Sequence, residues 1–242
     1  MSEPYVYAVR LARERIEEPD KFPFCLACVR NLDRLELSPK ITFLVGENGV
    51  GKSTLIEAIA VALRFNPEGG SRNFNFATRE SHSELHEYLV LERSSRRMAD
   101  GFFFRAESFY NVASELEKVG VVRSYGGRSL HEQSHGEAFL SLLEHRFNGG
   151  GVFILDEPEA ALSPSRQLTV LRMFHDLLKE ASQFIIATHS PILLSYPGAW
   201  IYQVSQQGIE RVAFESTEHF QVSREFLAAP ERMLRVLLSD ED

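Results

Sequence analysis

The sequence predicts one α/β domain, built on a mainly parallel sheet with an antiparallel edge. Three observations lead to this fold class. Short apolar runs that look like strands alternate with helical patterns. One such run ends in a glycine-rich loop that opens a helix, and two runs near the C-terminal end are spaced as a hairpin. A length of 242 residues and a hydrophobic fraction of 44% suit a single domain over residues 1–242.

The first part of the chain combines strands with one helix. YVYAVRL and FCLACVRNL, at residues 5–11 and 24–32, are expected to be strands on either side of a charged excursion. ITFLV is a buried strand that ends in the glycine loop, and the apolar pattern after it predicts a short helix at 53–63. Proline, glycine and asparagine between residues 64 and 80 predict a loop.

Beyond that loop, strands and helices alternate regularly, as expected for parallel strands joined by helical crossovers. The expected elements are a strand starting at 101–108, helices near 136–147 and 165–180, apolar strands at 151–158 and 183–190, a hairpin of 199–204 and 209–214, and a helical tail from 217 to 238.

Charge and apolar runs exclude several classes of protein. Lys and Arg number 26 against 34 Asp and Glu, a formal net charge of −8. This disfavours a generic nucleic-acid binder, which needs clustered cations, but is compatible with a local basic patch. The sequence has no apolar run of about 18 residues, and its N-terminal stretch lacks a signal-peptide core. We therefore expect a cytoplasmic protein without direct membrane insertion.

Two cysteines, Cys25 and Cys28, form a C-x-x-C pattern that invites a metal-binding interpretation. If 24–32 is a strand, positions i and i+3 face opposite sides, and the two sulfurs cannot share one ion. No second C-x-x-C completes a zinc site, so we interpret the pair as structural.

The strongest functional signal is the stretch GENGVGKST, which fits G-x-x-x-x-G-K-[ST] between a buried strand and a helix. Glycines let backbone N–H groups surround phosphates, and the helix start adds its dipole. Lys52 is expected to reach the β- and γ-phosphates, and the Ser53 hydroxyl to bind Mg²⁺. The predicted nucleotide-binding residues of this loop are Gly46, Glu47, Asn48, Gly49, Val50, Gly51, Lys52, Ser53 and Thr54.

Polar residues follow two later apolar strands. Asp156 and Glu157 come after VFIL, and His189 follows FIIAT. The carboxyl ends of parallel strands are where ligands bind in such sheets. We expect Asp156 to hold Mg²⁺, Glu157 to deprotonate the attacking water, and His189 to hydrogen-bond the γ-phosphate.

Residues 131–135, His-Glu-Gln-Ser-His, match the H-E-x-x-H pattern of zinc proteases. That chemistry needs both histidines on one face of a helix interior. Ser134 with Glu137 instead forms a capping-box pattern, which predicts that a helix begins there. The apolar stripe starts only after it, and Gly136 is better tolerated at a helix start than inside one. We favour the helix start over zinc.

These motifs, in this order, resemble the ABC-type ATPases, and the resemblance covers most of residues 24–204. In that family the Glu after the strand-end Asp is the catalytic base and the His is a switch residue, which would be Glu157 and His189. The family signature is matched as Ser134-His135-Gly136-Glu137. The resemblance implies ATP as substrate with Mg²⁺, and a homodimer in which Ser134 and Gly136 contact the partner's nucleotide.

Some family positions are matched less closely. Ser163 stands where the loop after the Asp-Glu pair usually has Asp. Glu107 is the candidate for the family's Q-loop position and for a further metal ligand. The resemblance places the signature in a helical part at roughly 64–147, and leaves a helical tail at roughly 217–242.

THSP and DEPEAALSP resemble the soluble RecF and SMC-type branch more than transporter subunits. From Lys52 to Ser134 is only 134 − 52 = 82 residues, without sustained heptads, which implies a compact head without a coiled-coil arm. Three processes stay open: DNA repair or a similar nucleic-acid task, ATP binding for a membrane transporter, and a nucleotide-gated switch that binds a protein. The segment SRNFNF could stack on a base; we favour a structural or lid role.

Overall fold

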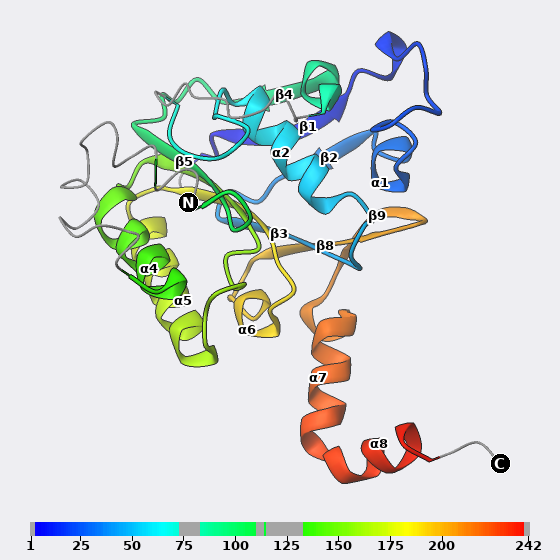
Figure 1. Ribbon diagram of the computed structural model, residues 1–242. Helices are drawn as coiled ribbons and strands as arrows, with labels where there is room; N and C mark the ends of the chain where they lie inside the picture. The colour runs from blue at the N-terminus through cyan, green and yellow to red at the C-terminus, as the bar shows by residue number, and fades with distance from the viewer. Residues whose placement is uncertain (1–2, 73–82, 110–113, 115–132, 240–242) are drawn as a thin grey trace.

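The main sheet has six strands in the order β5-β6-β7-β3-β8-β9 (Figure 1). The computed structural model describes residues 3–72, 83–109, 114 and 133–239. The first five strands of the sheet run parallel and only the edge strand β9 is antiparallel, which confirms the predicted fold class. The strands are β3 (Ile41–Val45), β5 (Asp100–Arg105), β6 (Gly151–Asp156), β7 (Gln183–Ala187), β8 (Trp200–Ser205) and β9 (Gly208–Val212).

Helices cover both faces of this sheet, because every residue of β3, β6 and β7 is buried and successive side chains point to opposite faces. On one face, Leu44 and Ile154 join the core beneath α2 (Lys52–Ala62). On the other, Phe43 and Phe153 join the core beneath α4 (His135–Arg146), α5 (Pro164–Lys179) and α6 (Pro191–Leu194). The start of α2 and the start of α4 therefore belong to opposite layers.

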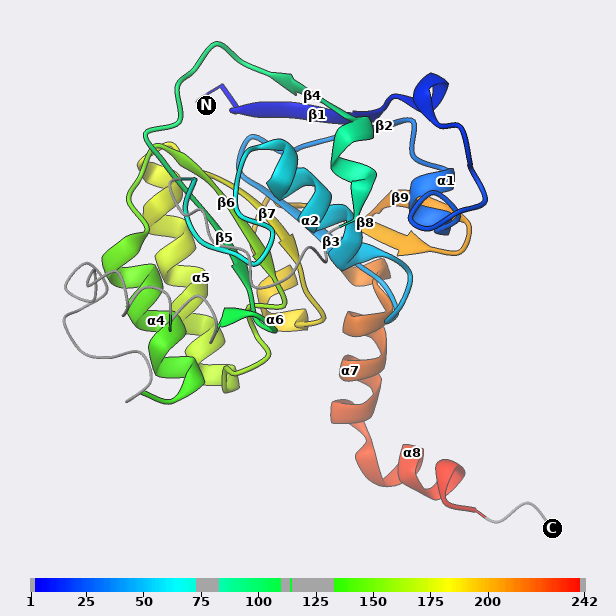
Figure 2. The same ribbon diagram turned by 45° about the horizontal axis from the view of Figure 1, so that its top comes forward.

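A second, antiparallel sheet lies on the α2 side (Figure 2). It has the order β2-β1-β4, with β1 (Val6–Leu11), β2 (Arg34–Glu36) and β4 (Leu89–Arg93). The sequence prediction of a strand at 24–32 was wrong. That segment holds turns and a short helix, α1 (Ala27–Arg30), which buries two consecutive residues, Cys28 and Val29. β1 pairs instead with β4 and with β2, whose three residues are too few to show the alternating pattern of a strand.

The two cysteines differ in environment: Cys25 is exposed and Cys28 is buried. A Cβ placed on Gly51 would come 2.5 Å from Cys28 Sγ, so this thiol packs directly beneath the glycine loop. Burial raises the pKa of Cys28 to about 11. Cys28 thus behaves as a small apolar side chain. The structural interpretation of this cysteine stands, but the reason given for it, a strand at 24–32, was wrong.

The part at roughly 64–147 was expected to be helical around the signature, with a loop at 64–80 and a strand starting at 101–108, and its described residues combine strands, turns and a helix. It contains a 3-10 turn at Glu84–Tyr88 and strands β4 and β5, before α4. β5 is the strand expected at 101–108, whereas β4 was not expected and pairs with the N-terminal strand β1. His131, Glu132, Phe74 and Phe76 lie outside the described residues.

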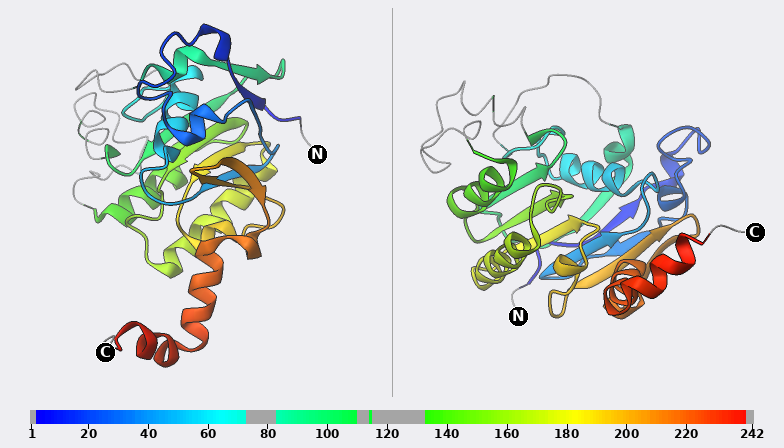
Figure 3. Two further views of the ribbon diagram at one scale, coloured as in Figure 1. Left: turned by 90° about the vertical axis from the view of Figure 1, so that its right-hand side faces the viewer. Right: turned by 60° about the horizontal axis from the view of Figure 1, so that its bottom comes forward.

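The predicted helical tail is present as α7 (Glu218–Ala228) and α8 (Pro230–Leu237), which project away from the sheet (Figure 3). Neither helix buries a residue. Short 3-10 turns occur at Arg13–Arg15 and Phe214–Ser216. No helix in the described ranges combines the length and apolar character needed to cross a bilayer.

Candidate functional site

The glycine loop links the end of β3 to the start of α2, and its backbone requires glycine at two positions. Gly46 has φ of 148°, and a Cβ there would lie 2.1 Å from the carbonyl oxygen of Val204. Gly51 has φ of 100° and is the N-cap of α2. Side chains at either position would therefore strain or displace the loop.

Lys52 is held inside this loop. Its side chain is 5% exposed, and Nζ donates hydrogen bonds to the carbonyl oxygens of Gly46 at 2.8 Å and Glu47 at 2.7 Å. Burial lowers the pKa of Lys52, and the nearby carboxylates of Glu157 and Asp156 oppose that shift. The loop thus fixes a cation at the start of a helix, where anions bind.

Ser53 and Asp156 meet although β7 separates their strands in the sheet. Ser53 Oγ donates to Asp156 Oδ1 at 3.1 Å. Burial raises the pKa of Asp156 to about 6, against the opposing charge of Arg105. A hydroxyl beside a carboxylate suits Mg²⁺, which takes one or two protein oxygens and completes its shell with water and phosphate. The pair opens on a cavity of about 310 Å³ lined by Ser53, Arg105, Ala106, Glu107, Asp156 and Glu157.

Arg105 is a site residue that the sequence reasoning missed. Its Nε lies 3.8 Å from Asp156 Oδ2, and its guanidinium also pairs with Glu57 at 2.5 Å and Glu107 at 3.4 Å. The signal was available: Arg105 follows FFF, and the strand register sets it beside Asp156. Glu107 lines the same cavity, but its side chain is 84% exposed.

Glu157 has a constrained backbone at the end of β6. Its φ of 51° lies in the left-handed region, which is uncommon for a residue with a side chain. Its N–H donates to the carbonyl oxygen of Ala187 at 3.0 Å, and its Oε1 lies 3.7 Å from His189 Nε2. Such strain is found where the surrounding structure fixes a functional side chain.

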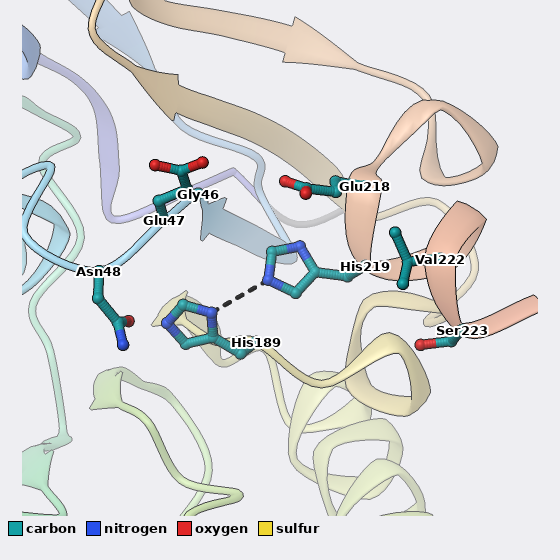
Figure 4. A pocket seen from close by; sticks show the side chains of 8 residues that line it. All are labelled: Gly46, Glu47, Asn48, His189, Glu218, His219, Val222 and Ser223. Atoms are coloured by element: carbon teal, nitrogen blue, oxygen red, sulfur yellow. Dashed lines mark hydrogen bonds between the residues drawn. The ribbon is translucent and has the colours of Figure 1, made fainter. Parts of the chain in front are cut away.

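His189 is held by two residues that the sequence reasoning did not assign to the site. Its backbone N–H donates to Glu159 Oε1 at 2.5 Å, and its Nδ1 lies 3.0 Å from Nε2 of His219 on α7. Figure 4 shows the two imidazoles in this contact, and both line a cavity of about 400 Å³ together with Gly46, Glu47 and Asn48. His219 has no recognisable motif around it, so its approach comes only from the fold.

The capping box at the start of α4 is confirmed. Ser134 Oγ accepts from the N–H of Glu137, and Glu137 Oε2 accepts from the N–H of Ser134. Bonds to the Ser134 hydroxyl and N–H, with help from Arg166, lower the pKa of Glu137. A Cβ on Gly136 would lie 2.6 Å from the carbonyl oxygen of Ala161, so this glycine permits close packing within the chain itself.

Ser163, where the family pattern usually has Asp, is the N-cap of α5 and accepts a hydrogen bond from the N–H of Arg166. Arg166 also donates to Ser134 Oγ at 3.4 Å and pairs with Glu137 at 3.3 Å. The starts of α4 and α5 therefore form one polar cluster. Ser134 itself is exposed.

Two AAA-domain family models match the chain in succession. The first, described as an AAA domain, matches residues 24–135. The second, described as an AAA domain of a putative AbiEii toxin in a type IV toxin–antitoxin system, matches residues 133–195. Between them they span the glycine loop, the start of α4, the Asp156–Glu157 pair and His189.

Curated relatives are ATP-binding proteins. The macrolide export ATP-binding/permease protein MacB of Campylobacter jejuni is 23% identical over 179 residues, which are 61% of this chain and 26% of that protein. MacB of Rhodopseudomonas palustris is 28% identical over 191 residues, 68% of this chain and 28% of that protein. The chain thus spans about a quarter of the length of these relatives.

Among solved structures, cbiO1 from Clostridium perfringens, part of the ABC transporter complex cbiONQ, matches 97% of this chain and 99% of its own with a TM-score of 0.51. At 18% identity that likeness concerns the fold. The fold, the order of the motifs and the matching families agree. The chain resembles the ABC-type ATPases. The P-loop α/β architecture that the motifs predicted is confirmed, and the AAA-domain matches support ATP hydrolysis.

Proposed function

We propose that this chain is an ABC-type ATPase that hydrolyses ATP with Mg²⁺ at sites shared by two copies of the chain. The observation that carries the proposal is the convergence of four groups at the carboxyl ends of β3, β6 and β7. Ser53 Oγ lies 3.1 Å from Asp156 Oδ1, and Glu157 Oε1 lies 3.7 Å from His189 Nε2. A metal-binding pair thus sits beside a base and a hydrogen-bond donor.

Each group then has one task. Lys52 and the N–H groups of residues 46–54 bind the β- and γ-phosphates. Ser53 and Asp156 hold Mg²⁺, which neutralises phosphate charge when bound. Glu157 takes a proton from the water that attacks the γ-phosphate, and His189 donates from Nε2 to a γ-phosphate oxygen.

The layering of the fold supports a site shared between chains. The loop at the start of α2 and the start of α4 belong to opposite faces of the sheet. In the proposed dimer, the exposed Ser134 of each chain therefore contacts the nucleotide bound to the glycine loop of the other chain. Because Gly136 is buried against Ala161, its contribution to such a contact is its backbone N–H.

Asp156→Asn is expected to stabilise the nucleotide-free protein while abolishing hydrolysis. The folded pKa of Asp156, about 6, lies above the ordinary value near 3.9. As pH rises, Asp156 therefore ionises in the unfolded chain before it ionises in the folded protein. This lowers the free energy of unfolding progressively between about pH 4 and 6, and the loss stays constant above pH 6. Asparagine removes the charge and still accepts from Ser53.

We expect a gain on the order of 1–3 kcal/mol in the free energy of unfolding at pH 7, shrinking to zero near pH 4. Chemical denaturation in EDTA without nucleotide measures it, and Asp100→Asn, at a carboxylate paired with Arg146, is the contrasting control. If Asp156→Asn instead lowers the free energy of unfolding at pH 7, the burial cost of the Asp156 carboxylate does not exceed the gain from its contact with Arg105, contrary to the prediction.

The process we propose is a nucleic-acid task of the RecF and SMC type. The supporting observation is a cavity of about 370 Å³ that includes Arg64, Arg72 and Arg146 with one carboxylate, Asp100, in its lining. On a chain of net charge −8 this is a concentrated basic site, of the kind that phosphate contacts need. The similarity to the export protein MacB and to cbiO1, part of an ABC transporter complex, favours a second candidate, the ATP-binding part of a transporter.

ATPase rates separate these candidates. A nucleic-acid role predicts that duplex DNA or RNA raises the rate at low salt, that the effect falls steeply with salt, and that Arg64→Glu with Arg72→Glu removes it without lowering the basal rate. A transporter role predicts no response to nucleic acid and stimulation only by a co-purified membrane subunit. That second result would overturn the nucleic-acid proposal and leave the ATPase site intact.

A further inference from the structure

The contact between His189 and His219 joins the γ-phosphate side of the site to the C-terminal helix. His189 Nδ1 and His219 Nε2 are 3.0 Å apart, a normal hydrogen-bond length. The outer nitrogens, His189 Nε2 and His219 Nδ1, are buried and have no hydrogen-bond partner within the described residues. The pair therefore has one shared proton position, on the contact drawn as a dashed line in Figure 4, and two outer nitrogens. Of these, His189 Nε2 lies 3.7 Å from Glu157 Oε1.

Two tautomer arrangements satisfy the shared bond. If His189 Nδ1–H donates, His189 Nε2 carries a lone pair toward Glu157 and the phosphate site, where it repels both. If His219 Nε2–H donates, His189 Nδ1 accepts and His189 Nε2 carries the hydrogen. Which ring nitrogen is protonated is set by the bond that the other nitrogen makes. The second arrangement is favoured, because only it directs an N–H at the anionic site.

His219 is well placed to impose this arrangement. Thr217, fully buried, is the N-cap of α7: its hydroxyl accepts from the N–H of Phe220 at 3.3 Å and donates to the carbonyl oxygen of Phe214 at 2.7 Å. His219 is thus fixed in the first turn of the helix. Burial lowers the pKa of both imidazoles, and Lys52 lowers them further, which favours neutral rings near pH 7.

We propose that His219 is a positioning residue: it donates from Nε2 to His189 Nδ1 and thereby holds His189 in the tautomer and orientation that present Nε2–H to the γ-phosphate. This inference rests on the role of His189 in the proposed function. It makes the docking of α7 on the body of the protein a condition for full turnover.

Three variants of the full chain test the proposal. His219→Leu should lower kcat about tenfold, the lower range for residues that orient another histidine, while KM changes little because the glycine loop still binds the nucleotide. His219→Gln should recover most of the loss, since its amide N–H reaches the same acceptor. Leu227→Ala, at an exposed position on the same helix, should keep the parent rate and controls for changes to α7.

A spectroscopic measurement reports the tautomer directly. In nucleotide-free protein with ¹⁵N-labelled histidine, His189 should show a protonated Nε2 and a bare Nδ1, with a Nδ1 shift that moves in His219→Leu and returns in His219→Gln. An unchanged spectrum in His219→Leu would overturn the proposal. So would an equal loss of rate in the Leu and Gln variants.

Failure of the proposed function gives a different pattern. If His189→Ala keeps full activity, His189 has no role in turnover, yet the tautomer measurement still tests its contact with His219. If His189→Ala is impaired and His219→Leu is not, only the positioning role falls. Adding His219→Leu to His189→Ala should cause no further loss, because the second residue acts through the first.

Discussion

Replacing Glu157 by glutamine is expected to lower kcat by 10²–10⁴-fold, the range for loss of a positioned general base, while ATP still binds. Glutamine keeps the size and the hydrogen-bonding reach of the side chain but cannot accept the proton of the attacking water. Its backbone bond to Ala187 is retained, so the unusual φ of 51° should persist. The loss should therefore appear in kcat and not in nucleotide affinity.

The same variant should accumulate an ATP-bound dimer, because in the proposed shared site the γ-phosphate between the two chains persists. Single-turnover kinetics with a parallel measurement of molar mass under ATP and under ADP would test both effects. Glu144→Gln, an equal change of charge on an exposed part of α4, is the matched control. Parent-like turnover in Glu157→Gln would remove this residue from the mechanism.

Mixing two inactive variants should restore ATP-dependent dimers. Lys52→Ala removes the cation fixed by the carbonyl oxygens of Gly46 and Glu47, and Ser134→Arg places a bulky cation at the exposed start of α4. Each homodimer then contains two damaged sites. In the mixed dimer both lesions fall on one site, and the other joins an intact loop to an intact α4.

The main measurement is dimerisation of the two variants, mixed at equal concentrations with ATP and followed by light scattering. Hydrolysis also recovers if one intact site can turn over without the other. Ser163→Ala, at the start of the neighbouring α5, separates loss of the interface from loss of a helix cap. Parent-like dimerisation of Ser134→Arg alone would make Ser134 a structural cap and nothing more.

The sequence was sufficient for the main sheet because its central strands are short apolar runs with polar groups at their ends. β3, β6 and β7 were located to within a few residues. It was insufficient for the small sheet, because β2 has only three residues and α1 follows no amphipathic period. In the helical part expected at roughly 64–147, the strand at 101–108 was predicted and is β5, but β4 was missed because its pairing with the distant β1 specifies it.

For the candidate site, local sequence located the groups that belong to loops and strand ends, but not the groups that approach through the fold. Lys52, Ser53 and Asp156 follow a motif or a buried strand. Arg105 and His219 instead lie near these groups through strand register and through the path of α7, which no spacing along the chain encodes. The roles assigned to all these residues stay predictions until the variants are measured.

The strands and the tail should differ widely in local stability. Every residue of β3, β6 and β7 is buried, whereas α7 and α8 bury none. Amide hydrogens of the strands are therefore expected to exchange only through global unfolding, and those of the tail through small local openings. If His219 has the positioning role proposed for it, a molecule that stabilises the docked α7 would raise turnover without approaching the nucleotide, by lowering the population of locally opened tail.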